Sequence, residues 1–388
     1  MLPEGWEIKR VGDLCNFTNG NGFKPKEWSK HGLPIIRIQN LNGNRVFNFY
    51  AGELQEKWIV EPGQLLFAWA GTKGVSFGPS IWNGPKGVLN QHIYKLEVDK
   101  DVDRDWFFSS LVRVTEKIES QAHGFKATLV HVKKSDITDQ PIDVPPKKEQ
   151  TKIAQILSTW DQAIATTEKL IENNRAQKKA LMQQLLMGKK RLPGYSGKWQ
   201  PTAISELITE SRIAGTSGKE ARKITIKLYG KGVVAKRETR RGSKSTKYFK
   251  RQAGQFIYSK LDFLNGAFGI IPEHLDRYES TLDLPAFDFK TNVDPNWFLY
   301  YVSRKNFYSA NVGLANGGRK ARRVNPRDLL KLEIPRPDFI EQEAIAKVLL
   351  TADRETENIH SQLLCLKLEK AALMQQLLTG KRRVKVNQ

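Results

Sequence analysis

Residues 180–191 read ALMQQLLMGKKR, and residues 372–383 read ALMQQLLTGKRR. Ten of the twelve letters agree, and the two copies lie 192 residues apart in a chain of 388 residues. At the same offset, further matches extend upstream to Gln150 and Gln342. The chain is therefore predicted to contain two repeated units that end in the same structural element.

Each copy carries an apolar stripe whose steps alternate between four and three residues, the pattern of a heptad repeat. Gly188 and Gly380 follow the last turns, where helix C-caps occur. We predict two long helices, each about 58 Å at 1.5 Å per residue, that bury their stripes against each other. The alternative is two separate helices, each packed on its own domain. The stripe positions are Ile153, Leu157, Trp160, Ile164, Thr167, Ile171, Asn174, Lys178, Leu181 and Leu185, then Ile345, Leu349, Ala352, Thr356, Ile359, Leu363, Leu366, Lys370, Leu373 and Leu377.

The segments that flank the two helices repeat in circular order. Residues 188–208, after the first helix, resemble the N-terminal residues 1–14, and Trp199 matches Trp6. After the second helix the sequence continues GKRRVKVNQ and stops. The end of the second unit therefore reads on into the start of the first. This order predicts two tandem units arranged like a closed ring with pseudo-twofold symmetry.

The two globular segments share a sparse frame and differ in the sequence between its marks. We expect an α+β protein in which two α/β domains, related by a pseudo-twofold axis, are separated by a pair of long coiled-coil-like helices. The shared marks are Gly63-Gln64 and Gly254-Gln255, Trp106-Phe107 and Trp297-Phe298, and Asp136-Ile137 and Asp328-Leu329. The expected boundaries are 1–143, 144–192, 193–334 and 335–388.

The chain is strongly basic, with 63 Lys and Arg against 41 Asp and Glu, a formal net charge of +22. Such an excess favours a polyanionic partner, with nucleic acid the first candidate and an anionic membrane surface the second. Basicity that serves only solubility is the simpler alternative.

A membrane or secreted protein is not expected. The longest purely apolar run is residues 65–70, far short of the roughly 20 residues that span a bilayer. The start, MLPEGWEIKR, lacks the order of a signal peptide. The two cysteines, Cys15 and Cys365, stand far apart without a CxxC pair, which argues against a disulfide framework and fits a reducing cytoplasm.

Short strands punctuated by Gly, Pro and Asn are predicted in the first globular segment. Residues 33–41 and 89–98 alternate apolar and polar residues, so each strand should project polar side chains from one face. Arg, Gln and Asn are the types that contact guanine and adenine edges, although surface amides are also common without such a role. The candidates for DNA contact are Lys24, Arg37, Gln39, Asn40, Lys73, Asn90, Gln91 and His92.

The second globular segment is more plainly basic. Residues 236–251, KRETRRGSKSTKYFKR, are predicted to form a loop that binds phosphates; a solvated basic loop is the alternative. A strand over 225–232 should present Lys227 and Tyr229 on one face, and a turn should carry Asn265. The candidates are Lys227, Tyr229, Lys231, Arg237, Arg240, Arg241, Lys244, Lys247, Asn265, Arg319, Lys320 and Arg322.

No catalytic or metal-binding motif is evident. Residues 215–220, GTSGKE, lack the spacing of a phosphate-binding loop, and the six histidines form no metal-binding motif. Residues 143–148, DVPPKK, differ from the Asp-Pro-Pro-aromatic loop of adenine methyltransferases by an inserted Val and a Lys in place of the aromatic residue. We therefore expect no catalytic residue, metal or cofactor. A stand-alone nuclease or modification enzyme with an unrecognised active site is the alternative.

The alternation of variable segment and repeated helix resembles the specificity subunit of type I restriction-modification enzymes. The marks are the proline-rich run leading to Glu149-Gln150, then Ile153-Ala154 and Asp161, with their twins at Glu341-Gln342, Ile345-Ala346 and Asp353. Residues 20–23, the IIRIQNLNG stretch and the LNQHI stretch look like a common type of target recognition domain. The second segment lacks these last marks.

The resemblance implies a non-catalytic subunit. Each target recognition domain would read one half of a bipartite, asymmetric site in double-stranded DNA. The two helices would run antiparallel and set the gap between the halves. The helices would also dock two methyltransferase subunits, which bring S-adenosylmethionine, and restriction-translocase subunits would join that core. This chain would itself hold no cofactor.

Overall fold

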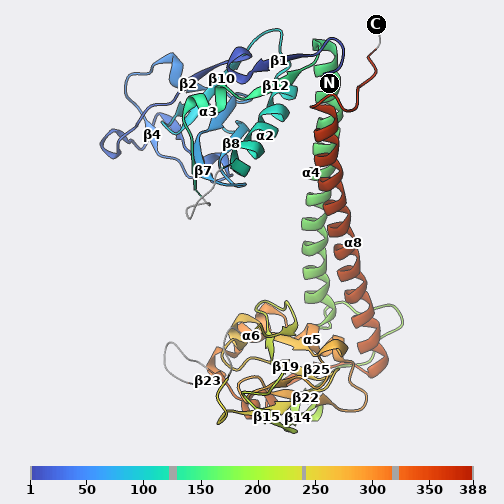
Figure 1. Cartoon of the computed structure of the whole chain (residues 1–388). Coiled ribbons are helices and arrows are strands. Elements are labelled where there is room, and N and C mark those ends of the chain that lie inside the picture. Colours follow the sequence, from blue (N-terminus) through green and yellow to red (C-terminus); the bar gives the residue numbers. More distant parts are fainter. Residues whose placement is uncertain (1, 122–128, 238–241, 317–322, 387–388) are drawn as a thin grey trace. The chain divides into compact units, whose positions relative to one another are not determined.

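The computed structural model describes residues 2–121, 129–237, 242–316 and 323–386 (Figure 1). The contacts within the chain divide it into two compact units. Unit 1 comprises Met1–Thr167 and Gln362–Gln388, and unit 2 comprises Glu168–Ser361. Each unit therefore contains one β-rich segment and a part of each long helix. The α+β architecture expected from the sequence is confirmed.

Unit 1 is built on two four-stranded sheets. One sheet has the order β2-β10-β6-β8 with antiparallel neighbours, and the other has the order β4-β3-β9-β5, in which β3 and β9 are parallel. Its strands are β1 Glu7–Arg10, β2 Cys15–Asn19, β3 Leu33–Ile36, β4 Phe49–Tyr50, β5 Ile59–Val60, β6 Leu65–Ala68, β7 Ala70–Thr72, β8 Gly78–Ile81, β9 Gly87–Leu89, β10 Ile93–Val98, β11 Leu129–His131 and β12 Pro141–Val144. Its helices before the long one are α1 Ile38–Leu41, α2 Arg104–Gln121 and α3 Lys134–Thr138.

Unit 2 repeats the first of these sheets as β14-β22-β19-β20 and adds a three-stranded sheet, β15-β18-β21. The strand pair β1-β12 of unit 1 has its counterpart in β13-β25. The strands are β13 Gln200–Ala203, β14 Ile208–Ser211, β15 Ala214–Ser217, β16 Ile224–Ile226, β17 Val233–Ala235, β18 Lys247–Lys250, β19 Phe256–Tyr258, β20 Phe268–Ile270, β21 Glu279–Ser280, β22 Ala286–Phe289, β23 Ala315–Asn316, β24 Arg323–Val324 and β25 Glu333–Arg336. The short helices are α5 Pro295–Val302, α6 Lys305–Ala310 and α7 Pro326–Leu330.

The repeated segments form two helices of 39 residues each, α4 Lys147–Leu185 and α8 Phe339–Leu377. Every predicted stripe position on both helices is buried or half-buried, whereas most of the other positions are exposed. Within each unit the two helical segments run antiparallel and are joined by ion pairs. Lys370 pairs with Asp161 at 2.5 Å in unit 1, and Lys178 pairs with Asp353 in unit 2. The predicted heptad seam is confirmed, and the alternative of two helices without a shared seam is wrong.

A buried glutamate holds the start of each long helix. In unit 1, Glu149 is 3% exposed, accepts a hydrogen bond from Trp6 at 3.3 Å and pairs with Arg383. In unit 2, Glu341 is 1% exposed and pairs with Arg191 at 2.6 Å. Trp199 completes this second cluster by donating to Glu341 at 2.9 Å.

The C-terminal residues of the chain therefore take the same place in unit 1 as residues 188–199 take in unit 2. Gly188 and Gly380 both have positive φ values, 64° and 68°. A Cβ at Gly380 would clash with the Pro3 ring, because the chain passes directly over the N-terminal segment. The circular order predicted from the sequence is thus realised inside unit 1. The pseudo-twofold relation between the units stays a prediction.

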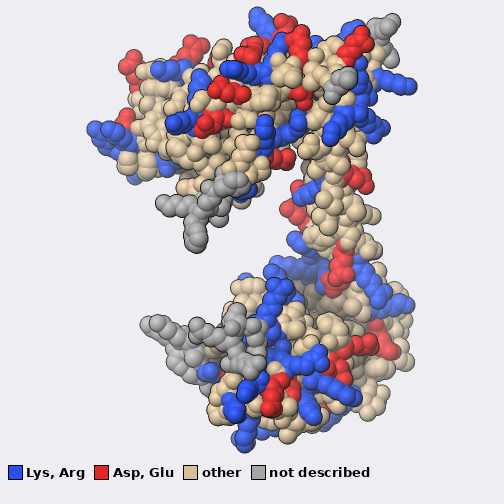
Figure 2. All heavy atoms as spheres, in the orientation of Figure 1, with Lys and Arg blue, Asp and Glu red and all other residues tan. Residues whose placement is uncertain are grey.

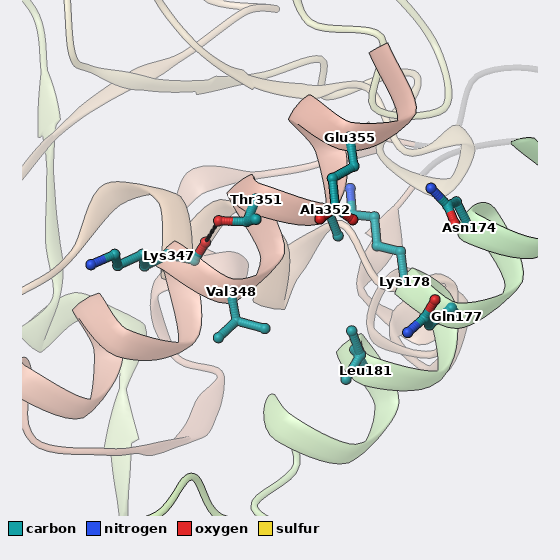
Figure 3. A pocket seen from close by; sticks show the side chains of 9 residues that line it. All are labelled: Asn174, Gln177, Lys178, Leu181, Lys347, Val348, Thr351, Ala352 and Glu355. Carbon is teal, nitrogen blue, oxygen red and sulfur yellow. Dashed lines mark hydrogen bonds between the residues drawn. The ribbon is translucent and has the colours of Figure 1, made fainter. Parts of the chain in front are cut away.

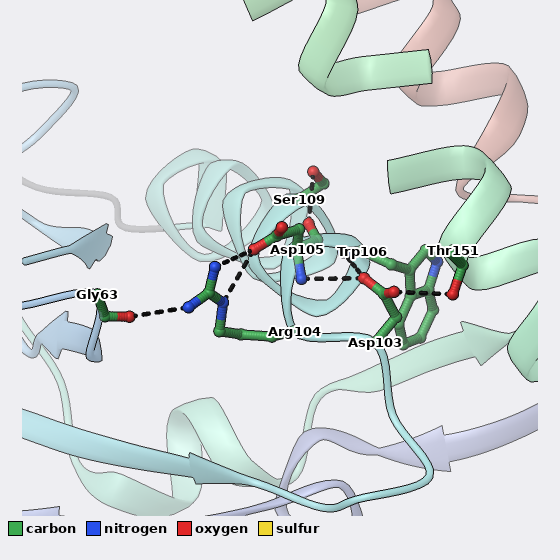
Figure 4. A network of polar contacts seen from close by, with 7 residues as sticks. All are labelled: Gly63, Asp103, Arg104, Asp105, Trp106, Ser109 and Thr151. Atoms are coloured by element: carbon green, nitrogen blue, oxygen red, sulfur yellow. Dashed lines mark hydrogen bonds and ion pairs between the residues drawn. The ribbon is translucent and has the colours of Figure 1, made fainter. Parts of the chain in front are cut away.

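A capped helix N-terminus ties each globular segment to its long helix. In unit 1, Asp103 Oδ1 accepts from the backbone N–H groups of Asp105 and Trp106, at 3.1 and 3.0 Å (Figure 4). Its other oxygen accepts from Thr151 of α4 at 2.8 Å. Asp294 accepts from Trp297 in the same way in unit 2. Such caps satisfy N–H groups that the helix leaves free. In unit 2 the contact with the long helix is made by the Asp294 N–H, which donates to Gln342 Oε1 of α8 at 3.0 Å.

Candidate nucleic-acid interface

Three segments of unit 1 that are distant in sequence meet at one place. Asn21 donates its backbone N–H to the Leu89 carbonyl at 2.8 Å, and Asn90 donates to the Ile36 carbonyl at 3.0 Å. A Cβ at Gly20 would clash with the backbone of Asn90, so glycine is needed for this close approach. The partly exposed residues 20–22, 37 and 90–92 therefore lie together at one surface, above the buried Ile36 and Leu89.

Most of the predicted contact residues of unit 1 lie on or beside this surface. Lys24, Gln39 and Gln91 are exposed, and Asn90 and His92 are half-buried. The Arg37 guanidinium stacks on the Trp28 ring at 4.3 Å. Stacking of this kind orients the guanidinium without using its hydrogen-bond donors.

Two of these side chains keep unused hydrogen-bonding atoms. Arg37 Nη2 and His92 Nδ1 are buried, and neither has a hydrogen-bond partner among the described residues. Buried polar atoms are usually paired, so an unpaired one needs an explanation. Both lie on residues that the sequence indicated for DNA contact.

The strand predictions around this surface were wrong in part. The predicted strand 33–41 ends at Ile36 and turns into the short helix α1, because Asn40 caps it by accepting from the Arg37 N–H at 2.9 Å. The predicted strand 89–98 is broken between β9 and β10. Its side chains also fail to alternate: Ile93, Tyr94, Lys95 and Leu96 are all buried. The cause is that both faces of β10 are covered, with Leu96 and Ile93 in different core clusters.

Two predicted contact residues of unit 1 have structural partners. Asn40 is 5% exposed, and its side-chain amide donates to the carbonyls of Asn44 and Val46 at 3.0 Å each. It therefore has no free donor and shapes the loop instead. Lys73 is exposed, and its ammonium donates to the Glu119 carbonyl near the end of α2 at 2.8 Å.

In unit 2 the predicted strand 225–232 is also wrong beyond its second residue. β16 ends at Ile226, and residues 227–232 form the loop that leads into β17. Tyr229 is 70% exposed in the left-handed region, with φ of 59°. Its N–H donates to the Asn265 carbonyl at 2.9 Å. The structure thus brings Tyr229 and Asn265 together on neighbouring loops, and Lys227 and Lys231 flank them as exposed residues.

The basic run 236–251 is only partly a loop. Lys236, Arg237 and Lys244 are exposed, whereas Lys247 begins strand β18 and is also exposed. Arg251 is 1% exposed and donates to Ser280 Oγ at 2.8 Å. Desolvation lowers the pKa of its guanidinium to about 10, so this residue belongs to the core. Arg240, Arg241, Arg319, Lys320 and Arg322 lie outside the described residues.

Lysine and arginine side chains cover much of both units, with acidic side chains between them (Figure 2). Over the described ranges, no group of three or more His, Cys, Asp or Glu could hold a metal ion. No helix in the same part of the chain is long and apolar enough to cross a membrane. The excess of basic side chains is the feature of these surfaces that favours a polyanionic partner such as nucleic acid.

Comparison with known proteins bears on this interpretation. The family model described as "type I restriction modification DNA specificity domain" matches residues 3–173. The type I restriction enzyme MjaVIII specificity subunit of Methanocaldococcus jannaschii is 24% identical over 427 residues, covering 99% of this chain and 94% of the relative. The EcoBI specificity subunit of Escherichia coli is 28% identical over 174 residues, covering 44% of this chain and 35% of the relative.

Along almost its whole length the chain is similar to the specificity subunits of type I restriction-modification systems. Solved structures support the fold of this specificity subunit along its length. The S subunit from M. genitalium has a TM-score of 0.54 at 14% identity, covering 98% of this chain and 97% of that one. A chain from a study of type I complex assembly and conformational transition has a TM-score of 0.62 at 13% identity, covering 98% and 100%.

These similarities support a DNA specificity subunit, as the resemblance implied. Sequence reasoning passed over one part of its surface. Trp69 stands in the apolar run 65–70, which reads as core, but the side chain is half-buried among His92 and His131. The residue type alone does not indicate a surface role for Trp69. An alignment of the repeated marks in the two globular segments could have indicated it.

Proposed function

We propose that this specificity subunit reads a bipartite, asymmetric site in double-stranded DNA, one half with each β-rich segment. The observation that carries the proposal is a repeated frame with different exposed residues. Unit 1 presents amides and imidazoles around Asn90, Gln91 and His92, whereas unit 2 presents lysines around Tyr229 and Asn265. Different donor and acceptor sets read different base pairs, so the two halves of the site should differ.

The exposed cations of unit 2 supply contacts to phosphate. Lys236, Arg237, Lys244 and Lys247 are exposed on and beside one loop. Contacts of this kind add affinity on every sequence and make binding sensitive to salt. We propose the same role for Arg240, Arg241, Arg319, Lys320 and Arg322, and for Lys24 and Lys73 in unit 1.

The long helices act as the spacer between the two reading segments. Each has 39 residues, which corresponds to about 58 Å. That length spans at most roughly 17 base pairs at 3.4 Å each. A gap well below this limit, with about one DNA turn between half-site centres, is consistent with such a spacer.

The helices also dock two methyltransferase subunits, and restriction-translocase subunits join that core. Large apolar side chains remain exposed on both helices: Leu170 is 47%, Leu364 is 60% and Leu368 is 62% exposed. Leu364 and Leu368 are four residues apart on α8 and so share a face. Apolar residues of this size at a surface indicate a contact with another protein. S-adenosylmethionine and the adenine chemistry belong to the partners, in the cytoplasm.

Base-modification sequencing of genomic DNA tests this function. A host expresses the partner methyltransferase with and without this chain, and methylated adenines are mapped. The expected result is a split motif that appears only when the chain is present. Identical methylation in both hosts would contradict the proposal.

The alternative, a stand-alone enzyme, is tested by incubating the purified chain with DNA and either magnesium or S-adenosylmethionine. We expect neither cleavage nor methylation. Turnover that persists through stringent purification and coincides with the chain would favour the alternative.

A further inference from the structure

One surface position occupies the same place in both frames. Trp69 follows β6 in unit 1, donates its N–H to the His92 carbonyl at 3.2 Å, and accepts at its carbonyl from Val132 at 3.1 Å. Lys260 follows β19 in unit 2 and makes the same two backbone contacts. Its N–H donates to the Asp283 carbonyl at 2.9 Å, and its carbonyl accepts from Val324 at 3.0 Å. The backbones at these positions are therefore equivalent.

In unit 1 the side chains around this position are aromatic and imidazole rings. The Trp69 ring lies 5.0 Å from the His92 ring and 4.8 Å from the His131 ring, edge to face in both cases. The indole N–H is 3.4 Å from the Asn19 side-chain oxygen. His131 and Asn19 are exposed, and Gln91 extends the cluster through a contact of 3.2 Å with His92.

In unit 2 the equivalent side chains are charged. Asp283 takes the place of His92, and Arg323, the last residue before Val324, takes the place of His131. Arg323 pairs with Asp283 at 3.3 Å, and the two side chains are 44% and 59% exposed. The three residues thus offer two cationic donors and one carboxylate acceptor at one surface.

The fold does not explain this difference. The frame beside it is the same in both units: a Gly-Gln pair precedes each strand, with φ of 87° at Gly63 and 84° at Gly254. The side chains that differ are exposed or half-buried, and an exposed ion pair contributes little to stability. A position whose backbone is fixed while its surface chemistry changes between two readers is suited to specify sequence.

We infer that these two sets of three residues, Trp69, His92 and His131 in unit 1 and Lys260, Asp283 and Arg323 in unit 2, each read a base pair. This inference rests on the proposed function and names residues that carry it. Arg and Lys contact guanine O6 and N7, and Asp accepts from cytosine N4. The unit 2 set therefore reads a G·C pair. The apolar indole face suits a thymine methyl group beside the amide of Gln91, so the unit 1 set reads an A·T pair.

The test uses the full chain with its partner methyltransferase and maps methylated motifs for four variants. Asp283→Asn keeps the size of the side chain but adds a donor, and Arg323→Lys keeps the charge but loses the planar fork. Each should relax the preference for one G·C pair in one half-site by about 10- to 100-fold. Trp69→Phe and His131→Ala should relax an A·T pair in the other half-site, by about 10-fold.

Matched controls lie in each unit. Arg277 pairs with Asp276 at 3.6 Å and is 87% exposed, so Arg277→Lys makes the same change outside the set. Ile8, 65% exposed on β1, serves as Ile8→Ala for unit 1. Both should leave the motif unchanged, and thermal unfolding should show all variants folded.

The two proposals fail in different ways. Absence of any chain-dependent motif with the unchanged chain contradicts the proposed function itself. A normal split motif that stays the same in all four variants overturns the inference, as does relaxation in the wrong half-site. Selection of binding sites from a randomised DNA pool by the same complex gives a second readout that does not depend on methyl transfer.

Discussion

The two helix pairs share a heptad seam but differ at several of its positions, among them one layer at which the side-chain volume changes strongly. Unit 1 places Trp160 and Leu366 there, whereas unit 2 places Ala352 and Asn174 at the equivalent positions. In unit 2 a pocket of about 360 Å³ opens beside Ala352, and Asn174 and Lys178 line it (Figure 3). A repeated backbone therefore does not give repeated packing, because packing depends on side-chain volume at each layer.

The clamp at the start of each long helix does not differ between the units in this way. It consists of Trp6, Glu149 and Arg383 in unit 1, and of Trp199, Glu341 and Arg191 in unit 2. The Trp-Glu-Arg cluster is kept in both units, with Glu149 and Glu341 almost completely buried. A buried carboxylate is costly unless it is paired and hydrogen-bonded. The chemistry of the clamp is therefore the same in both units, whereas the seam layer differs in side-chain volume.

Exchange of a whole globular segment should have the largest effect. Replacing residues 1–143 with the equivalent segment of a relative should change one half of the recognised site completely and leave the other half intact, since each segment has its own core. Methylation mapping of the exchanged chain is the measurement. A change in both halves would show that the two units do not read independently.

Loss of a clamp arginine should have the next largest effect. Arg191→Ala leaves Glu341 buried without its cation, and removing one partner of a buried pair costs about 3–5 kcal/mol. Arg383→Ala should cost less, because the Arg383 side chain is 45% exposed against 23% for Arg191. Denaturant unfolding measures both. The hydrogen bond to each glutamate raises the pKa of its arginine. The contribution of each ion pair to the free energy of unfolding is therefore lost only in strong alkali, as the pH rises through the raised pKa of the arginine. Equal and small losses would contradict the role of the clamp.

The seam layer gives a pair of opposite predictions. Trp160→Ala in unit 1 should destabilise by about 2 kcal/mol, less than for a fully buried tryptophan because the side chain is half-buried. Ala352→Leu in unit 2 should stabilise by about 1 kcal/mol, because it fills the pocket. The melting temperatures of the two variants, measured by thermal unfolding, test both predictions. A loss of stability in Ala352→Leu would mean that the pocket cannot accept a larger side chain.

Cysteine reactivity should show the smallest effect. Cys15 begins β2 and is buried, and Ile208 begins the equivalent strand β14 in unit 2. Desolvation, followed by the nearby Asp99, raises the pKa of the Cys15 thiol from 9.0 to about 12. The thiol ionises from about pH 9 in the unfolded chain but stays neutral in the folded chain, so its contribution to stability is fully present below pH 9 and is lost as the pH rises from 9.0 to about 12.

Alkylation of the native chain at neutral pH should modify the exposed Cys365 and spare Cys15, because the thiolate is the reactive form. Mass spectrometry identifies the modified site. As a control, Cys15→Ala should leave the labelling of Cys365 unchanged. Rapid modification of Cys15 in the folded chain would show that unit 1 opens locally.

Much of the frame was predictable because it depends on local chemistry. The stripe from Ile153 to Leu185 requires only the spacing of apolar residues, and the positions of Gly188 and Gly380 follow from the need to end a helix. The strand errors arose where neighbours override local pattern. β10 is covered on both faces, so its side chains do not alternate, and Asn40 caps a helical turn where a strand was expected.

The sequence by itself determined the repeat, the heptad seam, the circular order of the units and the basic surface, because each is a property of residue type and spacing along the chain. Only the tertiary structure decided which distant residues share a surface. Trp69 meets His131, and Lys260 lies beside the Asp283–Arg323 pair, through backbone contacts between strands. Such contacts depend on sheet register, and no periodicity in either segment encodes that register.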